Sequence, residues 1–347
     1  MVRHLYDPND TCTFKKLASL SISVKQALPW SGMERDARRD CVPGLKSINR
    51  KRSDMISMIP EETVLLIHLG GLGDMCLSES TILSLSQRFD GKIHGLGYTR
   101  FLGLFREYFA AVHAIESARW LYLFSDDPSR VSWKRIIFIG KDRNGEMRKR
   151  WQSMSRDRLI FIEMYPDEAF SDQRFPVGGI GTQADLPLHI EDYQLAQLKA
   201  YCIKTVKKTV IPRPRHRALL YPETGFAKSK WHPDNFVQLY HRLKKRNLNV
   251  SIFESFGLKL DTPEKLSIED LSDMEKCFED GGIFVSNDSG MAHLAGSCGL
   301  TTITVFSDFD PALWHPRGDN IALRQGMDRV DVPALEALIT GLMEPGT

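Results

Sequence analysis

The sequence contains no long hydrophobic run and no excess of charge of one sign. No stretch of its 347 residues reaches the ~18 apolar residues that a membrane-spanning helix needs, and the N-terminus lacks the apolar core of a signal peptide. We therefore expect a cytoplasmic protein. The 46 Lys and Arg residues nearly balance the 44 Asp and Glu residues, a net charge of +2, which argues against a strongly basic nucleic-acid-binding protein.

The cysteines are also sparse, and they are not paired. They form no CxxC motif and no short regular spacing, so the sequence predicts neither a zinc site nor a disulfide framework. We expect six reduced thiols, and several of them lie inside apolar stretches. The cysteines are Cys12, Cys41, Cys76, Cys202, Cys277 and Cys298.

The first 60 residues differ in composition from the rest of the chain. Residues 1–60 hold 11 Lys and Arg against 6 Asp and Glu, a surplus of +5, whereas the remainder holds 35 against 38. They show no sustained hydrophobic period, so we expect a basic extension that is partly disordered or forms short helices. Two interpretations stay open: a peripheral association with the anionic inner membrane surface, and a solvated extension.

Strand-like and helix-like segments then alternate. Val64–Ile67 is a short apolar run typical of a strand buried on both faces, a glycine loop follows, and apolar residues recur at helical spacing as far as Phe89. Residues 61–205 are predicted to form an N-terminal Rossmann-like domain, and the proline- and lysine-rich residues 206–217 a linker. The further predicted strands of the N-terminal domain are Lys92–Tyr98, Arg135–Gly140 and Leu159–Tyr165.

The same alternation restarts in the second half. A helix should begin at Pro233, because proline is favoured in a first turn. Residues 218–330 are predicted to form a second Rossmann-like domain, and residues 331–347 a C-terminal helix. The predicted strands are Ala218–Tyr221, Asn249–Phe253, Gly282–Val285 and Thr301–Phe306. The fold class is therefore α/β, with two parallel sheets facing a central cleft.

Three segments carry residues typical of ligand binding. The first is the loop of Gly71, Leu72, Gly73 and Asp74, which feeds a helix N-terminus and could face an anion. It does not match the GxGxxG dinucleotide motif, because Cys76 stands where the last glycine would be, and this disfavours a nicotinamide enzyme. Asp74 has two interpretations, a catalytic group or an acid that caps the helix.

The second segment runs from Tyr221 to Trp231. A hydroxyl, a glycine and two lysines (Thr224, Gly225, Lys228 and Lys230) could hold a diphosphate, since ammonium groups neutralise it. The alternative is a surface loop with Trp231 packed on the domain.

The third segment is Asn287–His293. Small residues at Ser289, Gly290 and Ala292 allow a ligand to approach a helix N-terminus closely. Asp288 could cap that helix, and His293 could be a core histidine pointing into the sheet. Asp308-Phe309-Asp310 resembles a metal-binding DxD pair, but aspartate is common where a strand turns, so we predict no metal site.

Taken in order, these segments resemble glycosyltransferase family 9, the bacterial ADP-heptose:lipopolysaccharide heptosyltransferases. The resemblance rests on Gly71–Asp74, Tyr221–Pro233 and Asn287–His293, followed by the stretch from Phe306 to Pro316. It covers about residues 62–325.

The resemblance implies a GT-B fold, with the acceptor bound by the first domain and a nucleotide-sugar donor by the second. It implies inverting, metal-independent transfer with Asp74 as the general base and with Gly71, Leu72 and Gly73 as an acceptor or phosphate loop. The residues that it places around the donor are Thr224, Gly225, Lys228 or Lys230, Glu254 as the ribose-binding acid, Asp288, Ser289, Gly290, Met291, Ala292 and His293. Some details depart from the family pattern: Ser229 stands at the usual lysine position, and His232 separates Trp231 from Pro233. Ser289 replaces the common threonine but keeps the hydroxyl.

The main hypothesis is therefore a hexosyl- or heptosyltransferase that moves a sugar from a nucleotide donor, ADP-heptose, to a lipopolysaccharide-core or other cell-surface glycan. The donor is a co-substrate, and no cofactor is expected. Two alternatives stay open: a nucleotide-sugar epimerase or hydrolase on the same scaffold, and a non-catalytic relative that binds nucleotide sugars.

Overall fold

The computed structural model describes most of the chain from Thr63 onward. The described residues are 63–125, 133–155, 157, 159–166, 188–223, 230–254, 265–267, 270–324 and 330–343. The predicted extension at residues 1–60 and the predicted donor residues Thr224, Gly225 and Lys228 lie outside these ranges. Within them, no helix is long and apolar enough to cross a membrane.

The N-terminal half forms a five-stranded sheet in which every paired strand is parallel. Its spatial order is β3-β2-β1-β4-β5, so β1 lies at the centre, with Val64 opposite both Ile93 and Arg135. All five residues of β1 are buried, as expected for a strand with helices on both faces. The strands are β1 Val64–His68, β2 Ile93–Gly97, β3 Ala111–Ala114, β4 Arg135–Gly140 and β5 Ile160–Glu163.

The C-terminal half forms a six-stranded parallel sheet in the order β11-β10-β9-β6-β7-β8. Counted from β6, this is the Rossmann order, in which the strand order reverses between β6 and β9. The predicted α/β fold with two Rossmann-like halves is confirmed. The strands are β6 Ala218–Tyr221, β7 Val250–Phe253, β8 Lys265–Leu266, β9 Ile283–Asn287, β10 Thr301–Phe306 and β11 Asn320–Arg324.

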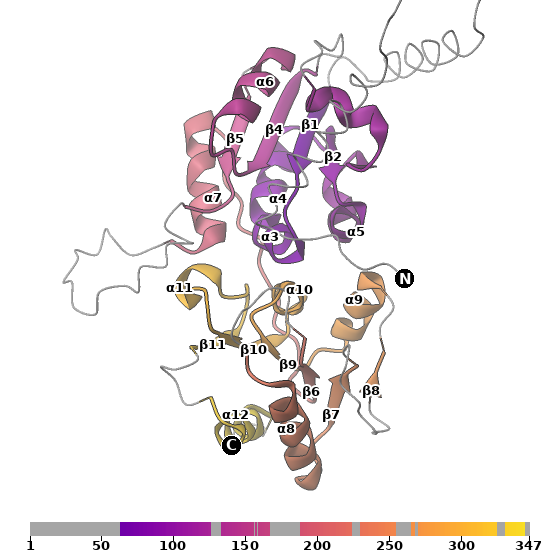
Figure 1. Cartoon of the computed structure of the whole chain (residues 1–347), viewed down its shortest axis with the longest axis vertical. Helices are drawn as coiled ribbons and strands as arrows, with labels where there is room; N and C mark the ends of the chain where they lie inside the picture. The colour runs from indigo at the N-terminus through magenta and orange to yellow at the C-terminus, as the bar shows by residue number, and fades with distance from the viewer. Residues whose placement is uncertain are drawn as a thin grey trace, which may run out of the picture.

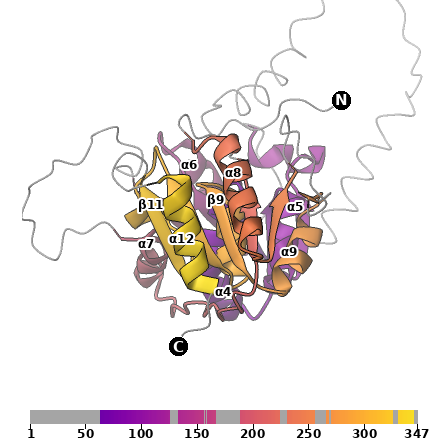
Figure 2. The same cartoon turned by 90° about the horizontal axis from the view of Figure 1, so that it is seen from below.

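Helices cover both sheets, and two of them lie between the halves. Figure 1 shows the N-terminal sheet above the C-terminal sheet, with α3 and α10 facing each other at the junction. Figure 2, from below, shows α8 and α12 side by side on the C-terminal sheet. The helices are α3 Leu72–Leu77, α4 Glu79–Arg88, α5 Thr99–Leu102, η1 Gly103–Tyr108, η2 Ala118–Leu123, α6 Glu146–Met154, α7 Ile190–Leu198, η4 Lys199–Tyr201, α8 Pro233–Lys245, α9 Leu271–Glu279, α10 Gly290–Ser297, α11 Pro311–Trp314 and α12 Val332–Met343.

Central elements follow the predictions more closely than peripheral ones. The bounds of β4, β6 and β10 match, and α8 begins at Pro233 as predicted. The single helix expected as far as Phe89 is instead two helices, α3 and α4, which meet at Ser78. The edge strands β3, β8 and β11 have no predicted counterpart, because none of their residues is buried and their hydrophobic patterns are weak.

Candidate active site

Two helix N-termini meet where the halves face each other. α3 starts four residues after β1, and α10 starts three residues after β9, so both begin at the carboxyl edges of central strands. A Cβ on Gly290 would lie 3.0 Å from the Leu72 Cβ and 3.1 Å from the Gly73 backbone nitrogen. A Cβ on Gly73 would lie 3.0 Å from the Cδ2 of His293. The structure therefore brings the first and third predicted segments into contact, and a Cβ at either glycine would require its neighbours to shift.

Asp74 occupies the first turn of α3. Its Oδ2 accepts a hydrogen bond of 2.8 Å from the Gly71 backbone N–H, so the carboxylate does bond to the helix start as the capping interpretation expects. It remains partly exposed. Burial raises the pKa of Asp74 to about 6, and the hydrogen bond from Gly71 opposes this rise. A pKa near neutrality suits a general base, and the first-turn position does not conflict with that role.

His68, at the end of β1, supports this loop from below. Its Nδ1 accepts a 3.3 Å hydrogen bond from the Gly70 backbone N–H, so Nε2 carries the proton and donates to the Ser78 Oγ at 3.2 Å. Burial lowers the pKa of His68 to about 4, which keeps the ring neutral. A Cβ on Gly70 would lie 2.6 Å from the Asp74 Cβ. His68 was not among the predicted site residues, although its place beside the glycine loop is visible in the sequence.

The loop after β9 differs from one expectation about its cap. Ser289, and not Asp288, is the N-cap of α10, and its Oγ accepts a 3.3 Å hydrogen bond from the Ala292 N–H. The Asp288 carboxylate is 14% exposed, and its Oδ1 lies 4.0 Å from the His293 Nε2. Burial and then the charge of Asp308 raise the pKa of Asp288 to about 7. Asp288 therefore does not cap α10, and it lies beside the first turn of this helix.

His293 does not point into the sheet as one interpretation expected. Its ring lies against Gly73 of α3, at the contact between the two halves. Burial is the main reason that its pKa falls to about 3, so the ring is neutral. Within the part of the chain that the structure describes, its buried Nδ1 has no hydrogen-bond partner. The N–H groups of Gly290 and Met291 precede the first intrahelical bonds of α10, and an anion at that end could accept from them.

Asn287 joins the second predicted segment to this loop. Its Oδ1 accepts a 2.8 Å hydrogen bond from the Trp231 backbone N–H, and its Nδ2 donates to the Trp231 carbonyl at 3.2 Å. The Asn287 side chain is buried, and so is Trp231, which packs on the domain as the alternative interpretation expected. Lys230 precedes this clamp and is exposed. The sequence motif includes Asn287, but no role was predicted for it. A polar residue at the end of a buried strand was the available sign of a structural role.

A cavity of about 820 Å³ lies to one side of α3, between the two halves. Leu72 and Met291 line it, as do Glu254 and the aromatic residues Tyr221 and Phe253 of the C-terminal sheet. Helix α5 supplies the opposite wall through residues 99–101. The lining is mixed, because the apolar residues alternate with charged ones, among them Arg100, Asp270 and Glu275.

The predicted ribose-binding acid, Glu254, stands at the end of β7 and lines this cavity. It is exposed, and its Oε1 lies 2.8 Å from the Lys265 Nζ. The hydrogen bond and charge of Lys265 lower the pKa of Glu254, so it is ionised at neutral pH and can accept hydrogen bonds from hydroxyl groups.

Tyr165 lies close enough to Asp74 to be affected by its charge, and it packs on an aromatic side chain of the other half. Tyr165 follows β5, and its ring centroid lies 5.4 Å from that of Trp314 in α11. The Lys141 Nζ lies 5.1 Å from the Tyr165 centroid. Burial, followed by the nearby charge of Asp74, raises the pKa of Tyr165 to about 12. Asp74 therefore lies near an aromatic and cationic wall.

The Asp308-Phe309-Asp310 segment has a structural role in the fold. Asp310 is the N-cap of α11, and its Oδ1 accepts a 3.0 Å hydrogen bond from the Ala312 N–H. Among the described residues, no group of three or more His, Cys, Asp and Glu side chains could hold a metal ion. Cys76, Cys202, Cys277 and Cys298 are free thiols.

The family model described as glycosyltransferase family 9 (heptosyltransferase) matches residues 265–334, which contain β9, α10 and β10. The match bears out the predicted resemblance to glycosyltransferase family 9 over this part of the second half. The match supports the prediction that the chain is a glycosyltransferase enzyme. The match lies on the loop of Asp288 and His293, and it stops short of Asp74.

Solved structures of two heptosyltransferases and of one family 9 glycosyl transferase share the fold of this chain. E. coli heptosyltransferase WaaC with ADP is 14% identical, with a TM-score of 0.56 over 81% of this chain and 99% of WaaC. E. coli ADP-heptose lps heptosyltransferase II is also 14% identical, with a TM-score of 0.55 over 81% of this chain and 98% of that one. A family 9 glycosyl transferase from Veillonella parvula is 9% identical, with a TM-score of 0.59 over 82% of this chain and 99% of that one. Among curated proteins, none matches the sequence. The GT-B fold class is confirmed.

The close packing of the two helix N-termini leads to a testable expectation for Gly290→Ala. The new Cβ meets the backbone of Gly73, so α3 and α10 must separate by a few tenths of an ångström. We expect kcat for sugar transfer to fall about tenfold, because small displacements of reacting groups are costly. Gly341→Ala in α12 is the control, since a Cβ there meets nothing within 4 Å. Equal kcat values in steady-state assays of the two variants would show that this packing does not matter for transfer.

Proposed function

We propose that this chain is an inverting, metal-independent heptosyltransferase. It transfers heptose from ADP-heptose to a lipopolysaccharide-core or other cell-surface glycan acceptor. Asp74 acts as the general base that takes the proton of the attacking acceptor hydroxyl. Base catalysis of this kind contributes about 10²- to 10⁴-fold to a rate.

One observation carries the proposal: Asp74, a partly exposed residue whose pKa is raised to about 6, lies in the first turn of α3, and this turn packs against Gly290 and His293 of α10. A base must be reachable by the acceptor and close to the bound donor. The first turns of α3 and α10 meet these two requirements together. With a pKa of about 6, Asp74 is mostly ionised at pH 7 and can accept a proton there.

The donor pyrophosphate would lie against the first turn of α10. There the N–H groups of Gly290 and Met291 and the Ser289 hydroxyl would donate to it, and a lysine of the second segment would neutralise charge. The nucleoside would occupy the cavity beside Met291, with Glu254 accepting hydrogen bonds from the ribose. In support, structures of E. coli WaaC hold ADP and ADP-2-deoxy-2-fluoro heptose on the same fold.

The acceptor would approach from the N-terminal half, along the wall formed by Lys141, Tyr165 and Trp314. The chain would work in the cytoplasm. Its basic residues 1–60, with their surplus of +5, would favour contact with the anionic inner face of the membrane, where such acceptors are assembled.

Nucleotide binding tests the donor assignment. Thermal unfolding of the protein is measured with ADP, UDP, GDP and CDP, because a ligand at 100 times its Kd stabilises the folded state by about 2.7 kcal/mol. We expect selective stabilisation by ADP. Lys228→Ala and Lys230→Ala are compared, and the lysine that contacts the diphosphate is the one whose loss reduces the ADP effect.

Selective stabilisation by another nucleotide would replace ADP-heptose as the donor. Stabilisation by none of the four would favour a non-catalytic relative. ADP release from ADP-heptose is then measured with and without a lipopolysaccharide-core acceptor. We expect release to depend on the acceptor, whereas an epimerase or hydrolase would consume the donor alone.

A further inference from the structure

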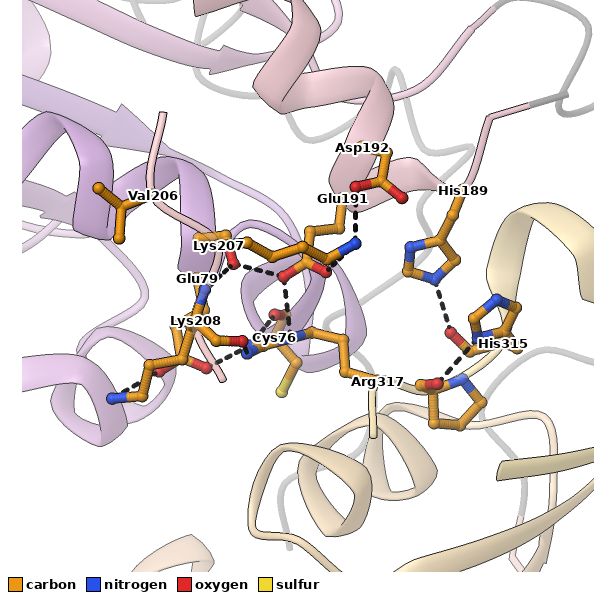
Figure 3. A network of polar contacts seen from close by, with 12 residues as sticks. Cys76, Glu79, His189, Glu191, Asp192, Val206, Lys207, Lys208, His315 and Arg317 are labelled. Carbon is orange, nitrogen blue, oxygen red and sulfur yellow. Dashed lines mark hydrogen bonds and ion pairs between the residues drawn. The ribbon is translucent and has the colours of Figure 1, made fainter. Parts of the chain in front are cut away.

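A buried arginine from the C-terminal half reaches into the N-terminal half at the back of α3. Arg317 lies in the turn between α11 and β11, and its side chain is 3% exposed. Figure 3 shows this guanidinium at the centre of a polar network between the two halves. The Nη1 donates to the Cys76 carbonyl at 3.3 Å and to the Glu79 carboxylate, and the Nε lies 2.9 Å from the Glu191 Oε1. The Nη2 donates to the Lys208 carbonyl at 3.2 Å.

All four partners precede β6 in the chain, so Arg317 ties the C-terminal half to α3, α4, α7 and the connecting segment at once. Both carboxylates are buried: the side chain of Glu79 is 7% exposed and that of Glu191 is 3% exposed. Removing water from three charges is costly unless each is paired and hydrogen-bonded. The three buried charges are therefore stable only when the guanidinium and the two carboxylates keep these relative positions.

The surrounding groups complete the pairing of these carboxylates. The Tyr108 hydroxyl donates to the Glu79 Oε1 at 2.8 Å, and the Ser80 Oγ donates to the Glu191 Oε1 at 2.5 Å. The Lys208 Nζ lies 3.6 Å from the Glu79 Oε1. Each buried charge thus has partners on more than one side, which leaves little freedom for the guanidinium to move.

The same turn is packed against the other side of the proposed site. A Cβ on Gly296 of α10 would lie 2.5 Å from the Arg317 carbonyl oxygen and 3.0 Å from the Pro316 Cβ. Gly318 has a φ of +77°, which favours glycine and lets the turn reverse direction. The Arg317 backbone therefore contacts α10, whose first turn carries Ser289 and His293, while its side chain holds α3, whose first turn carries Asp74.

We propose that Arg317 is a positioning residue for the transfer reaction. Its guanidinium holds the C-terminal end of α3 through Cys76, and the adjoining start of α4 through Glu79, against the turn on which α10 packs. It thereby sets the position of Asp74 relative to the first turn of α10. This inference rests on the proposed function, in which Asp74 acts on an acceptor beside a donor bound at α10.

Steady-state kinetics of Arg317→Lys test this role. Lysine keeps the charge but lacks the planar fork, so it cannot hold Cys76, Glu79 and Glu191 together. We expect kcat to fall about 10- to 100-fold while the KM for the nucleotide sugar stays within about threefold, because the donor is bound by the C-terminal half. Glu191→Gln is a second variant of nearly the same shape, and we expect a smaller fall in kcat in the same direction.

Arg215→Lys is the matched control. Arg215 pairs with Asp319, close to the same turn, but its pairing does not involve α3 or α4. Hydrogen exchange of the α3 amides is measured in parallel in the full chain without ligand. We expect faster exchange over residues 72–77 in Arg317→Lys, and exchange like that of the wild type in Arg215→Lys.

A folded Arg317→Lys variant with unchanged kcat, or one with only a lower Tm, would overturn the positioning role. A rise in KM without a fall in kcat would also overturn it, since it would place Arg317 in donor binding. If the wild type transfers no sugar, the proposed function fails separately. The exchange of the α3 amides would then decide alone, and equal exchange in the two variants would overturn the inference.

Discussion

Asp74→Asn is expected to abolish most of the transferase activity without disturbing the fold. The amide keeps the acceptor oxygen for the Gly71 N–H, so the start of α3 is retained. It cannot take a proton from the acceptor hydroxyl, and we expect kcat to fall about 10²- to 10⁴-fold. The KM for the donor and the shift of Tm by ADP should change little. An Asp74→Asn variant with at least a third of wild-type kcat would show that Asp74 only caps the helix.

The pH dependence of kcat provides an independent check on the same residue. With a pKa of about 6, Asp74 is mostly protonated at pH 5 and mostly ionised at pH 7. We expect wild-type kcat to rise about tenfold per pH unit below pH 6 and to level off above it. The residual activity of Asp74→Asn should lack this limb. The same limb in both proteins would assign it to another group, and Asp288 would be the first to examine.

The same substitution should change stability in the opposite direction to activity. A carboxyl whose pKa rises from 3.8 to about 6 on folding favours the folded state when protonated. That contribution is complete below about pH 4 and is lost as the pH rises through about 6. Asp74→Asn has no titrating carboxyl and does not lose this contribution. We expect the unfolding free energy of Asp74→Asn, relative to that of the wild type, to increase by on the order of 3 kcal/mol between pH 4 and pH 8. Chemical denaturation of both proteins at the two pH values measures it.

Asn287→Ala is expected to destabilise the C-terminal half and to weaken ADP binding. It leaves the buried N–H and carbonyl of Trp231 without partners, at about 1–3 kcal/mol for each group. We expect the free energy of unfolding to fall by about 2–4 kcal/mol and ADP binding to weaken, since the second segment loses its attachment to β9. Urea denaturation and ADP titration measure these two effects.

Asn320→Ala in β11 is the control for Asn287→Ala. The Asn320 side chain makes one exposed hydrogen bond, from its Nδ2 to the Gly318 carbonyl at 3.3 Å. Its removal should change the unfolding free energy by less than about 0.5 kcal/mol and leave ADP binding unchanged. Losses of similar size in the two variants would mean that the Asn287 clamp has no special importance.

The sequence alone was sufficient to predict the elements at the centre of each sheet. The runs at β1, β4, β6 and β10 consist of residues that can be buried on both faces, and this composition depends little on distant parts of the chain. The glycine loop before Asp74 and the Asn287–His293 segment were recognisable for the same local reason. A tight approach to a helix start requires particular small residues in a particular order.

The roles of several site residues could not be predicted in the same way. Whether Asp288 or Ser289 capped α10 depended on backbone angles that both residues can adopt, and the structure selects Ser289. The orientation of His293 toward Gly73 depended on the docking of α3 against α10. Asn287 contacts Trp231 across 56 residues of sequence, so no local pattern marks their pairing.

What the sequence by itself determined was the α/β alternation, the two Rossmann-like halves and the family relationship, because these depend on hydrophobic periods and short motifs. Only the tertiary structure decided that Arg317 meets Glu79 and Cys76, more than 230 residues earlier in the chain. A buried arginine and a buried glutamate look like ordinary surface residues in a sequence. Their pairing follows from the packing of the two halves. This packing removes water from both charges, and each charge then compensates the other.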